Sequence, residues 1–334
     1  MALTLVGVLA FMITCGLVPS CIWLAQRWRL IDAPDGQLKQ HAQPTPYLGG
    51  LAVYGGLWGA TALYHNLGSH GPGAAALLLP LYWSTTGLLL LGLWDDRYVL
   101  TPRAKLLGQM VCVGVFLGAN WCLGLTLPLV GWAGHLLLGA YLVTVINAFN
   151  LIDIMDGLAG TVTLGSASVL LYWSSTQTAP LVSLLLVALI GAVGGFLVYN
   201  APPARLYLGD SGSLLLGGYL AAVACYIPWQ NLGPGGLIWP VIAFALPLLE
   251  LVGLILIRWY KRQPIYLGSP DHFALYLRAK GWSNWQVLGL VGGFSSILFG
   301  VSWLFQAQLL GWWGVGLSAA GFLVSWYYLI YPPK

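Results

Sequence analysis

A succession of long apolar runs constrains this chain more than any other feature. About eleven such runs follow one another along the 334 residues, and most approach the ~20 residues that a helix needs to cross a bilayer. With 59% hydrophobic residues, the chain is not an ordinary soluble domain. We predict an all-α polytopic integral membrane protein with 10–11 transmembrane helices, forming a single domain over residues 1–334. The predicted helices cover residues 2–24, 48–67, 73–94, 106–122, 125–149, 162–173, 181–199, 214–228, 237–257, 287–304 and 310–330.

The charged residues are distributed unequally between the two sides of these runs. All thirteen Lys and Arg residues follow odd-numbered runs, whereas the even-numbered connections contain no Lys, Arg, Asp or Glu. Because cytoplasmic loops are enriched in Lys and Arg, this pattern predicts an outside N-terminus and a cytoplasmic C-terminus. A net charge of +4 on this face suits anionic lipid headgroups and phosphorylated substrates. No basic, aromatic-interleaved stretch supports nucleic-acid binding.

Eight of the nine acidic residues also lie on the predicted cytoplasmic side. The exception is Glu250, inside the predicted helix 237–257. An acid within a membrane segment is either functional or hydrogen-bonded to a neighbouring helix. We favour the structural interpretation and leave Glu250 out of the candidate site.

One polar stretch lies where the fifth apolar run ends. Asn147, Asn150, Asp153 and Asp156 recur there at three-residue spacing. Amide and carboxylate oxygens of this kind are ligands that Mg²⁺ prefers. In a continuous helix three residues turn by about 300°, so the first and last of the four would point in opposite directions. All four can converge only if the helix breaks, which Gly157 would permit. The alternative, an N-capping cluster for the next helix, would account for one of the four.

A tandem carboxylate pair follows the third apolar run. Adjacent Asp95 and Asp96 repel each other unless a cation, either Mg²⁺ or a Lys or Arg side chain, lies nearby. One carboxylate could then bind metal while its neighbour accepts a proton. The alternative is a solvated helix end in which the pair is neutralised by Arg97 and Arg103.

A Gly-Asp-Ser-Gly-Ser sequence precedes the eighth apolar run. Backbone amides at a helix N-terminus favour either an anion or a capping carboxylate, which places Gly209 and Ser211 among the candidate substrate-binding residues. Asp210 is then either the capping residue or a metal ligand.

Two further connections on the cytoplasmic side are basic. Lys39 and His41 precede the second apolar run and could contact a phosphate, although a basic loop beside anionic lipid is the simpler interpretation. The connection 258–284 is the longest polar segment, and long loops of this kind are often functional. It carries Arg262 and His272 among enough positive charge to hold a diphosphate.

Taken in order, these motifs are more specific than any one of them. Asp-Asp, Asn-x-x-Asn-x-x-Asp-x-x-Asp-Gly and Gly-Asp-Ser-Gly-Ser follow a Lys-x-His element and Pro-x-Pro-x-x-Gly-Gly. The set resembles the polyprenyl-phosphate N-acetylhexosamine-1-phosphate transferases, the MraY/WecA-like glycosyltransferase 4 family, over residues 31–280. The resemblance implies a Mg²⁺-dependent enzyme of the bacterial cytoplasmic (inner) membrane, with Mn²⁺ as an alternative metal. Such enzymes move a sugar-1-phosphate from a UDP-sugar to undecaprenyl phosphate and release UMP, at the first membrane step of a cell-envelope polysaccharide pathway.

The resemblance also implies roles for individual residues. Asn150 and Asp210 match metal-binding positions of the family. The implied catalytic residues are Asp95, Asp96 and Asp153, with the tandem pair linked to lipid-phosphate activation. The implied substrate-binding residues, which include Asp156 of the nucleotide-metal site and two lysines near phosphates, are Lys39, His41, Lys105, Asn147, Asp156, Gly209, Ser211, Arg262 and His272. We favour direct attack by the lipid phosphate over a covalent Asp intermediate.

The chain departs from the family in the connection 258–284. The family often has His-x-His-His there, whereas this chain keeps His272 and has Ala274 and Leu275 at the other two positions. The donor sugar could therefore differ. Absence of a Pro-Thr-Met-Gly-Gly sequence favours a WecA-like donor over the muramoyl-pentapeptide donor.

Two other classes of protein fit part of the pattern. Broken helices and intramembrane polar residues also occur in transporters for phosphorylated or anionic solutes. A transporter should alternate its access, yet nearly all the polar residues here lie on one face. A non-catalytic relative that only binds lipid phosphate would be favoured by missing carboxylates, but the five aspartates of the motifs are present. Exposed apolar helix faces would permit a homodimer in the bilayer.

Overall fold

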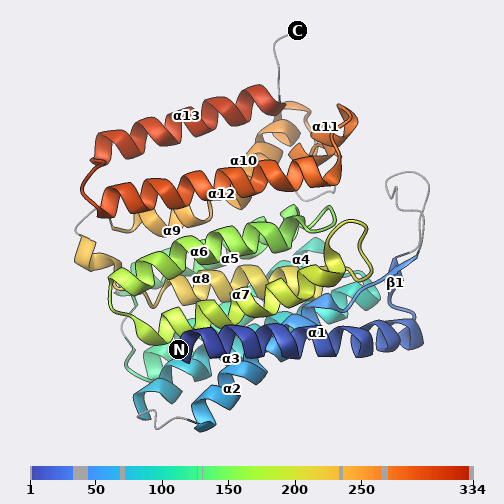
Figure 1. The fold of residues 1–334 in the computed structure, drawn as a ribbon, viewed down its shortest axis with the longest axis horizontal. Coiled ribbons are helices and arrows are strands. Elements are labelled where there is room, and N and C mark those ends of the chain that lie inside the picture. The colour runs from blue at the N-terminus through green and yellow to red at the C-terminus, as the bar shows by residue number, and fades with distance from the viewer. Residues whose placement is uncertain are drawn as a thin grey trace.

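The computed structural model describes residues 2–32, 44–67, 72–125, 127–129, 131–232, 236–264 and 270–330. Its long helices run side by side along one common direction (Figure 1). The helices are α1 Ala2–Trp28, α2 Gly49–Leu67, α3 Pro72–Tyr98, α4 Pro102–Cys122, α5 Gly131–Ile152, α6 Leu158–Thr176, α7 Pro180–Asn200, α8 Gly209–Ala224, the 3₁₀ helix η1 Trp229–Leu232, α9 Ile238–Ala243, α10 Ala245–Tyr260, α11 Phe273–Ala279, α12 Asn284–Gln306 and α13 Trp312–Ile330. Two short strands, β1 Ile31–Asp32 and β2 Thr45–Pro46, pair antiparallel with Ile31 opposite Pro46.

The apolar runs form helices as predicted, with one exception in their continuity. The run 237–257 is divided into α9 and α10 at Phe244, which has φ −106° and ψ 19°. Pro247 explains the division, because it has no N–H to bond the carbonyl four residues earlier and continue the helix across this point. The short helix α11 lies in a connection predicted only as a loop.

Several helices have the length and composition of membrane spans. Within the described residues, α1, α4, α5, α7 and α12 are long and apolar enough to cross a bilayer. Beside them, most of the remaining chain is also helical, with β1 and β2 as short strands. The protein is therefore an all-α polytopic membrane protein, as the apolar runs predicted.

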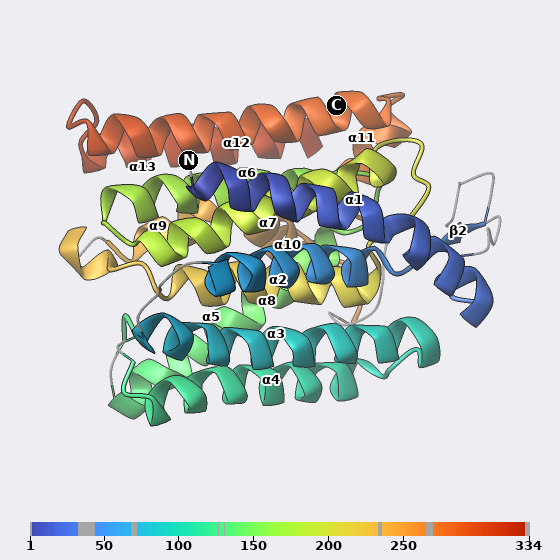
Figure 2. The same cartoon turned by 60° about the horizontal axis from the view of Figure 1, so that its bottom comes forward.

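Helix α8 lies at the centre of the bundle and is buried along almost its whole length. It packs against α2, α3 and α5 (Figure 2). Glycines permit backbone contact at these crossings: a Cβ added to Gly50 would lie 2.3 Å from Gly212 N, and one added to Gly92 would lie 2.3 Å from Ser211 Cα. Small residues allow such close approach of helices in membranes. The start of α8 is consequently held firmly between α2 and α3.

One end of the bundle gathers the polar connections. The paired strands β1 and β2 and the helix α11 lie at this end, whereas the start of α1 lies at the other (Figure 1). The C-terminal ends of α3 and α5 and the N-terminal ends of α4 and α8 meet there through their side chains. The cytoplasmic orientation of this end stays the prediction that the charge pattern made.

Candidate active site

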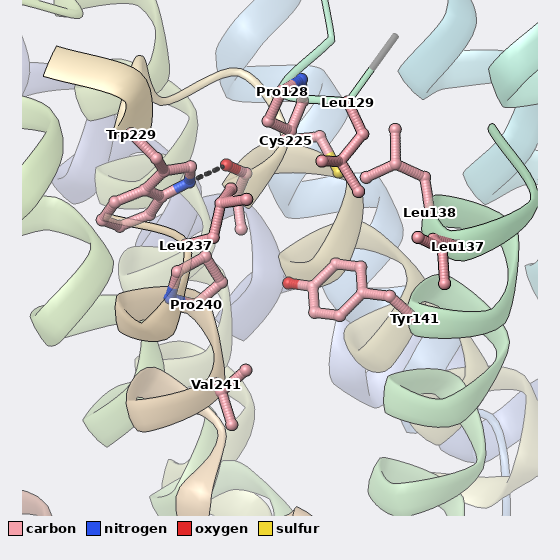
Figure 3. A pocket seen from close by; sticks show the side chains of 11 residues that line it. Pro128, Leu129, Leu137, Leu138, Tyr141, Cys225, Trp229, Leu237, Pro240 and Val241 are labelled. Atoms are coloured by element: carbon pink, nitrogen blue, oxygen red, sulfur yellow. Dashed lines mark hydrogen bonds between the residues drawn. The ribbon is translucent and has the colours of Figure 1, made fainter. Parts of the chain in front are cut away.

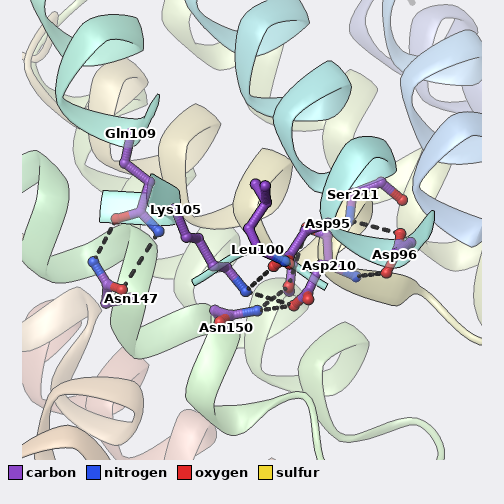
Figure 4. Close-up of polar contacts among 10 residues, drawn as sticks. Asp95, Asp96, Leu100, Lys105, Gln109, Asn147, Asn150, Asp210 and Ser211 are labelled. Atoms are coloured by element: carbon purple, nitrogen blue, oxygen red, sulfur yellow. Dashed lines mark hydrogen bonds and ion pairs between the residues drawn. The ribbon is translucent and has the colours of Figure 1, made fainter. Parts of the chain in front are cut away.

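Lys105, in the first turn of α4, lies between two carboxylates (Figure 4). Its Nζ is 2.8 Å from Asp95 Oδ2 and 3.0 Å from Asp210 Oδ1. Asn150, near the end of α5, donates through Nδ2 to the same Asp210 oxygen and to Ser213 Oγ, the latter at 2.9 Å. Residues from α3, α4, α5 and α8 thus meet in one cluster. We call Asp95, Lys105, Asn150 and Asp210 the lysine–aspartate cluster.

The second member of the tandem pair turns toward the start of α8. Asp96 accepts hydrogen bonds from the backbone N–H of Asp210 at 2.8 Å and of Ser211 at 3.2 Å. Gly209 has φ +75°, and a Cβ there would lie 2.7 Å from Asp96 Oδ2. The amides of this motif therefore hold a capping carboxylate, and Asp96 supplies it. The side chain of Asp210 is free to face Lys105 instead.

The two neighbouring carboxylates avoid repulsion by pointing to different partners. Asp95 is buried, and its Oδ1 accepts a hydrogen bond from Leu100 N at 2.6 Å while its Oδ2 faces Lys105. Among the described residues, the cation that neutralises Asp95 is thus Lys105, in place of the Arg97 and Arg103 that the sequence alternative named. Such pairing stabilises the charged form of a carboxylate.

The helix break predicted after Asn150 is present. Helix α5 ends at Ile152, and Gly157 has φ +76° before α6 begins. Asp156 accepts a hydrogen bond from Ala204 N at 3.0 Å, so its side chain faces the connection between α7 and α8. The connection between α5 and α6 is therefore fastened to the one that leads into the Gly-Asp-Ser motif.

Asn200, at the end of α7, joins the same two connections and was not singled out from the sequence. Its Oδ1 accepts from Gly157 N at 2.9 Å, and its Nδ2 donates to Leu206 O at 2.9 Å. Both ends of the buried amide are satisfied, which fixes the relative position of the two backbones. The available signal was a polar residue that closes an apolar run shortly before two prolines.

Asp153 lies between α5 and α6 and makes no hydrogen bond or ion pair to another described residue. Burial raises its pKa to about 8, and the nearby charges of Asp210, Asp96 and Asp156 act in the same direction. The carboxylates around Lys105 thus carry more negative charge than this lysine neutralises. Such an excess favours a bound cation or a protonated acid.

Asn147 lies outside the lysine–aspartate cluster. It donates through Nδ2 to Gln109 Oε1 at 2.7 Å and to Val143 O at 2.8 Å, and Gln109 Nε2 donates back to Asn147 Oδ1 at 3.4 Å (Figure 4). Gln109 follows Lys105 by four residues and so shares its helix face, a signal that the sequence offered. The amide pair joins α4 to α5 beside the cluster.

Two of the remaining predicted residues have described positions and make no hydrogen bond or ion pair with the lysine–aspartate cluster. His272 precedes α11, and its Nδ1 is 2.9 Å from Glu250 Oε1. Arg262 follows α10 and is exposed. Lys39 and His41 lie outside the described residues, so their predicted phosphate contacts stay predictions.

Comparisons of the sequence with known proteins identify a family. The sequence profile of glycosyl transferase family 4 matches residues 78–227. A phospho-N-acetylmuramoyl-pentapeptide-transferase of Geobacillus kaustophilus (strain HTA426) is 31% identical over 317 residues, which cover 86% of this chain and 92% of the relative. The chain belongs to this family. The MraY/WecA-like resemblance that the ordered motifs indicated is thereby confirmed.

The relatives of this chain are named for two different donors. A second phospho-N-acetylmuramoyl-pentapeptide-transferase, from Bacillus velezensis (strain DSM 23117 / BGSC 10A6 / LMG 26770 / FZB42), is 32% identical over 281 residues, covering 77% of this chain and 82% of the relative. A probable undecaprenyl-phosphate N-acetylglucosaminyl 1-phosphate transferase of Bacillus subtilis (strain 168) is 26% identical over 280 residues, covering 80% and 75%. The segment that the family profile matches contains the whole lysine–aspartate cluster, whereas His272 lies beyond it.

The donor set of this family member fits Mg²⁺ bound together with a substrate. Among the described residues, no three His, Cys, Asp or Glu side chains form a metal site of their own. Mg²⁺ is commonly held by one or two carboxylates, with substrate phosphates and water completing its shell. Asp210 supplies a carboxylate that shares Lys105 with Asp95, and Asn150 Oδ1 is not used by the two bonds that its Nδ2 donates. These two residues would hold the cation.

A small apolar cavity lies at the opposite ends of some of the same helices (Figure 3). Its volume is about 130 Å³, and the hydroxyl of Tyr141 points into it without a partner among the described residues. No charged side chain lines it, so it offers nothing that would bind a phosphate. The lining residues are Pro128, Leu129, Leu137, Leu138, Tyr141, Ala224, Cys225, Trp229, Leu237, Pro240 and Val241.

Proposed function

We propose that this protein transfers a sugar-1-phosphate, an N-acetylhexosamine-1-phosphate, from a UDP-sugar to polyprenyl phosphate and releases UMP. Undecaprenyl phosphate is the expected acceptor in the bacterial cytoplasmic membrane. The observation that carries this proposal is the meeting of Asp95, Lys105, Asn150 and Asp210 at one end of a membrane-embedded bundle. The reaction would be the first membrane step of a cell-envelope polysaccharide pathway.

The residues around Lys105 suit the binding of phosphates. Phosphoryl transfer depends on positioning and charge neutralisation more than on covalent chemistry of the protein. Lys105 provides a half-buried ammonium between two carboxylates, where an incoming phosphate oxygen could replace one of its partners. Asp210 and Asn150 would hold a Mg²⁺ ion, and its charge would supply neutralisation of the donor phosphates. Asp96 keeps Asp210 in place by capping α8.

Asp153 is the carboxylate best suited to accept a proton. The other carboxylates near it have hydrogen-bond or ionic partners, whereas Asp153 makes no such bond to a described residue and has a pKa raised to about 8. A base with a pKa near the working pH is effective in general base catalysis. The lipid phosphate would lose its last proton to Asp153, and its oxygen would form a bond to the sugar-bearing phosphorus. The bond from that phosphorus to the bridging oxygen would break, and UMP would leave with the electron pair.

The donor sugar is the point on which the similarities divide. The two relatives described above at 31% and 32% identity are named for the muramoyl-pentapeptide donor, so a UDP-muramoyl-pentapeptide is the second candidate. The chain lacks Pro-Thr-Met-Gly-Gly, and Ala274, at a position where the family often has His, is fully buried in the core. These departures support a smaller N-acetylhexosamine donor.

The proposal is tested by measuring UMP release from purified protein with undecaprenyl phosphate, Mg²⁺ and a panel of UDP-sugars that includes UDP-muramoyl-pentapeptide. We expect UMP with a UDP-N-acetylhexosamine, dependent on the lipid phosphate and abolished by EDTA. Release only with the muramoyl-pentapeptide donor would select the second candidate. Folded protein that releases UMP with none of the donors contradicts the transferase proposal.

A further inference from the structure

Two acid–base pairs connect α10 and the residue after it with the start of α11. The base lies on the α10 side in one pair, and the acid lies on that side in the other. Lys261, directly after α10, lies 2.5 Å from Asp271 Oδ1 through its Nζ. The next residue, His272, pairs through Nδ1 with Glu250 Oε1 at 2.9 Å, and Glu250 is inside α10. Two consecutive residues are therefore attached to α10, the first by its negative charge and the second by its imidazole.

Glu250 makes a second contact with the same oxygen. Phe273 N donates to Glu250 Oε1 at 3.3 Å, so one carboxylate oxygen accepts from the start of α11 as well as from the imidazole. A backbone N–H can only donate, which makes Oε1 an acceptor in this arrangement. With Nδ1 facing the carboxylate, Nε2 is the ring nitrogen of His272 that is left for a ligand. A carboxylate behind an imidazole fixes both the ring orientation and the tautomer.

Both residues of the Glu250–His272 contact are buried. Glu250 is 3% exposed and His272 is 6% exposed. Phe273 and Ala274, which follow His272, are buried in the apolar core. No histidine follows in α11, so His272 supplies the one imidazole of this segment. An acid in such a place costs free energy unless it is hydrogen-bonded, and its partner here is that imidazole.

Helix α12, which follows α11, borders the connection that carries Asp153. Shortly after α11, Leu288 in the second turn of α12 packs so closely on Gly157 that an added Cβ would lie 2.9 Å from Leu288 Cδ1. The start of α11 also lies at the end of the bundle where the polar connections gather (Figure 1). A donor bound near Asp153 and Asn150 would lie at the same end of the bundle as His272.

We propose that Glu250 is a positioning residue, which holds the imidazole of His272 so that its Nε2 contacts a phosphate of the nucleotide-sugar donor. The inference rests on the transferase function proposed above. It assigns to Glu250 an indirect role, exerted through His272, in donor binding and none in binding of the lipid phosphate.

The test is a comparison of donor and acceptor KM values in four variants. His272→Ala and Glu250→Met should each raise the KM for the UDP-sugar about tenfold, the usual scale for a lost hydrogen bond to a charged group, with the KM for polyprenyl phosphate unchanged. Glu250→Gln retains an acceptor oxygen of the same reach and should restore most of the donor affinity. Glu250→Met combined with His272→Ala should be no worse than His272→Ala alone, because both remove one interaction.

The neighbouring Lys261–Asp271 pair supplies the matched control. Lys261→Met breaks the Lys261–Asp271 contact and leaves the Glu250–His272 contact in place, so it should leave the donor KM within about twofold of the native value. If Glu250→Met does not reach the membrane folded, Glu250→Asp carries the same test, since it withdraws the carboxylate by one methylene. Multiplicative losses in the double variant, an equal rise in both KM values, or an unchanged donor KM would each overturn the inference.

Failure of the inference and failure of the proposed function are distinguishable. If the native protein releases no UMP with any donor, the transferase function itself is wrong. If the native protein is active and Glu250→Met leaves the donor KM unchanged, only the role of Glu250 is wrong.

Discussion

The two polar groups at this end of the bundle differ in how their charges balance. Around Lys105, the carboxylates of Asp95, Asp96, Asp153 and Asp210 outnumber the lysine that faces them. At the α10–α11 junction each acid has a basic partner, Glu250 with His272 and Asp271 with Lys261. In the first group carboxylates exceed cations, whereas in the second each acid has a basic partner.

This difference separates a site for chemistry from a site for positioning. Uncompensated carboxylates raise one another's pKa and attract cations, which suits the phosphate and metal binding that we propose for this centre. Paired charges hold two elements in register, and loss of one partner leaves the other without its bond. The same kind of substitution should therefore have different consequences in the two groups.

The largest expected effect comes from removing one negative charge in each group. Asp210→Asn should lower turnover by about a hundredfold or more, since it removes a proposed metal ligand and a partner of Lys105. Asp271→Asn, the matched change at the α10–α11 junction, should leave turnover within about threefold and lower the melting temperature instead. The measurement is the turnover of each variant, corrected for the amount of folded protein. Equal turnover would erase the distinction between the groups.

A smaller effect is expected from the packing that holds the start of α8. Gly92→Ala would place a Cβ 2.3 Å from Ser211 Cα, so the backbone that carries Asp210 and Ser211 must shift. Overpacking of this kind costs about 1–3 kcal/mol of unfolding free energy. Gly114→Ala is the control, because no atom lies within 4 Å of its added Cβ. Thermal unfolding in detergent should separate the two variants, and equal stability would mean that α8 is not held as described.

The smallest expected effect, at most about 1.4 kcal/mol per pH unit, is on the pH dependence of stability, and it tests the charge excess directly. Asp153 has a pKa of about 8 in the folded protein, against ~3.9 in an unfolded chain. Between these values the folded state binds a proton that the unfolded state does not, so stability falls as pH rises through this range. In EDTA, the melting temperature should fall between about pH 5 and pH 8 in the native protein, and Asp153→Asn should flatten this slope. A native slope that Asp153→Asn leaves unaltered would show that the charge at Asp153 is already compensated.

Much of the fold follows from local sequence. The apolar runs alone place the helices, because a backbone in lipid must satisfy its hydrogen bonds within one segment. The break after Asn150 was also predictable, since its polar neighbours could not share a face in a continuous helix and Gly157 permits a positive φ. The division at Phe244 was missed, although Pro247 gave the signal for it.

The candidate site was predictable in its members but not in its contacts. The motifs indicated Asp95, Asn150 and Asp210, which the structure brings around Lys105. Sequence could not assign Asp96 to the start of α8, because the two are 114 residues apart and meet only through tertiary packing. Asn147 was grouped with Asn150 by spacing alone, yet its helix direction takes it to Gln109. Pairings between helices depend on the packing of the whole bundle.

Transfer of the sugar-bearing phosphorus to lipid is the central claim, and one labelling measurement addresses it. A UDP-N-acetylhexosamine carrying ³²P in its sugar-bearing phosphate would be incubated with the protein, Mg²⁺ and undecaprenyl phosphate, and the label followed between butanol and water. We expect the label in the lipid phase in equal amount to the UMP released in water, with neither formed by Asp210→Asn. Label that leaves the donor only as water-soluble sugar phosphate, with none in the lipid, would contradict the account.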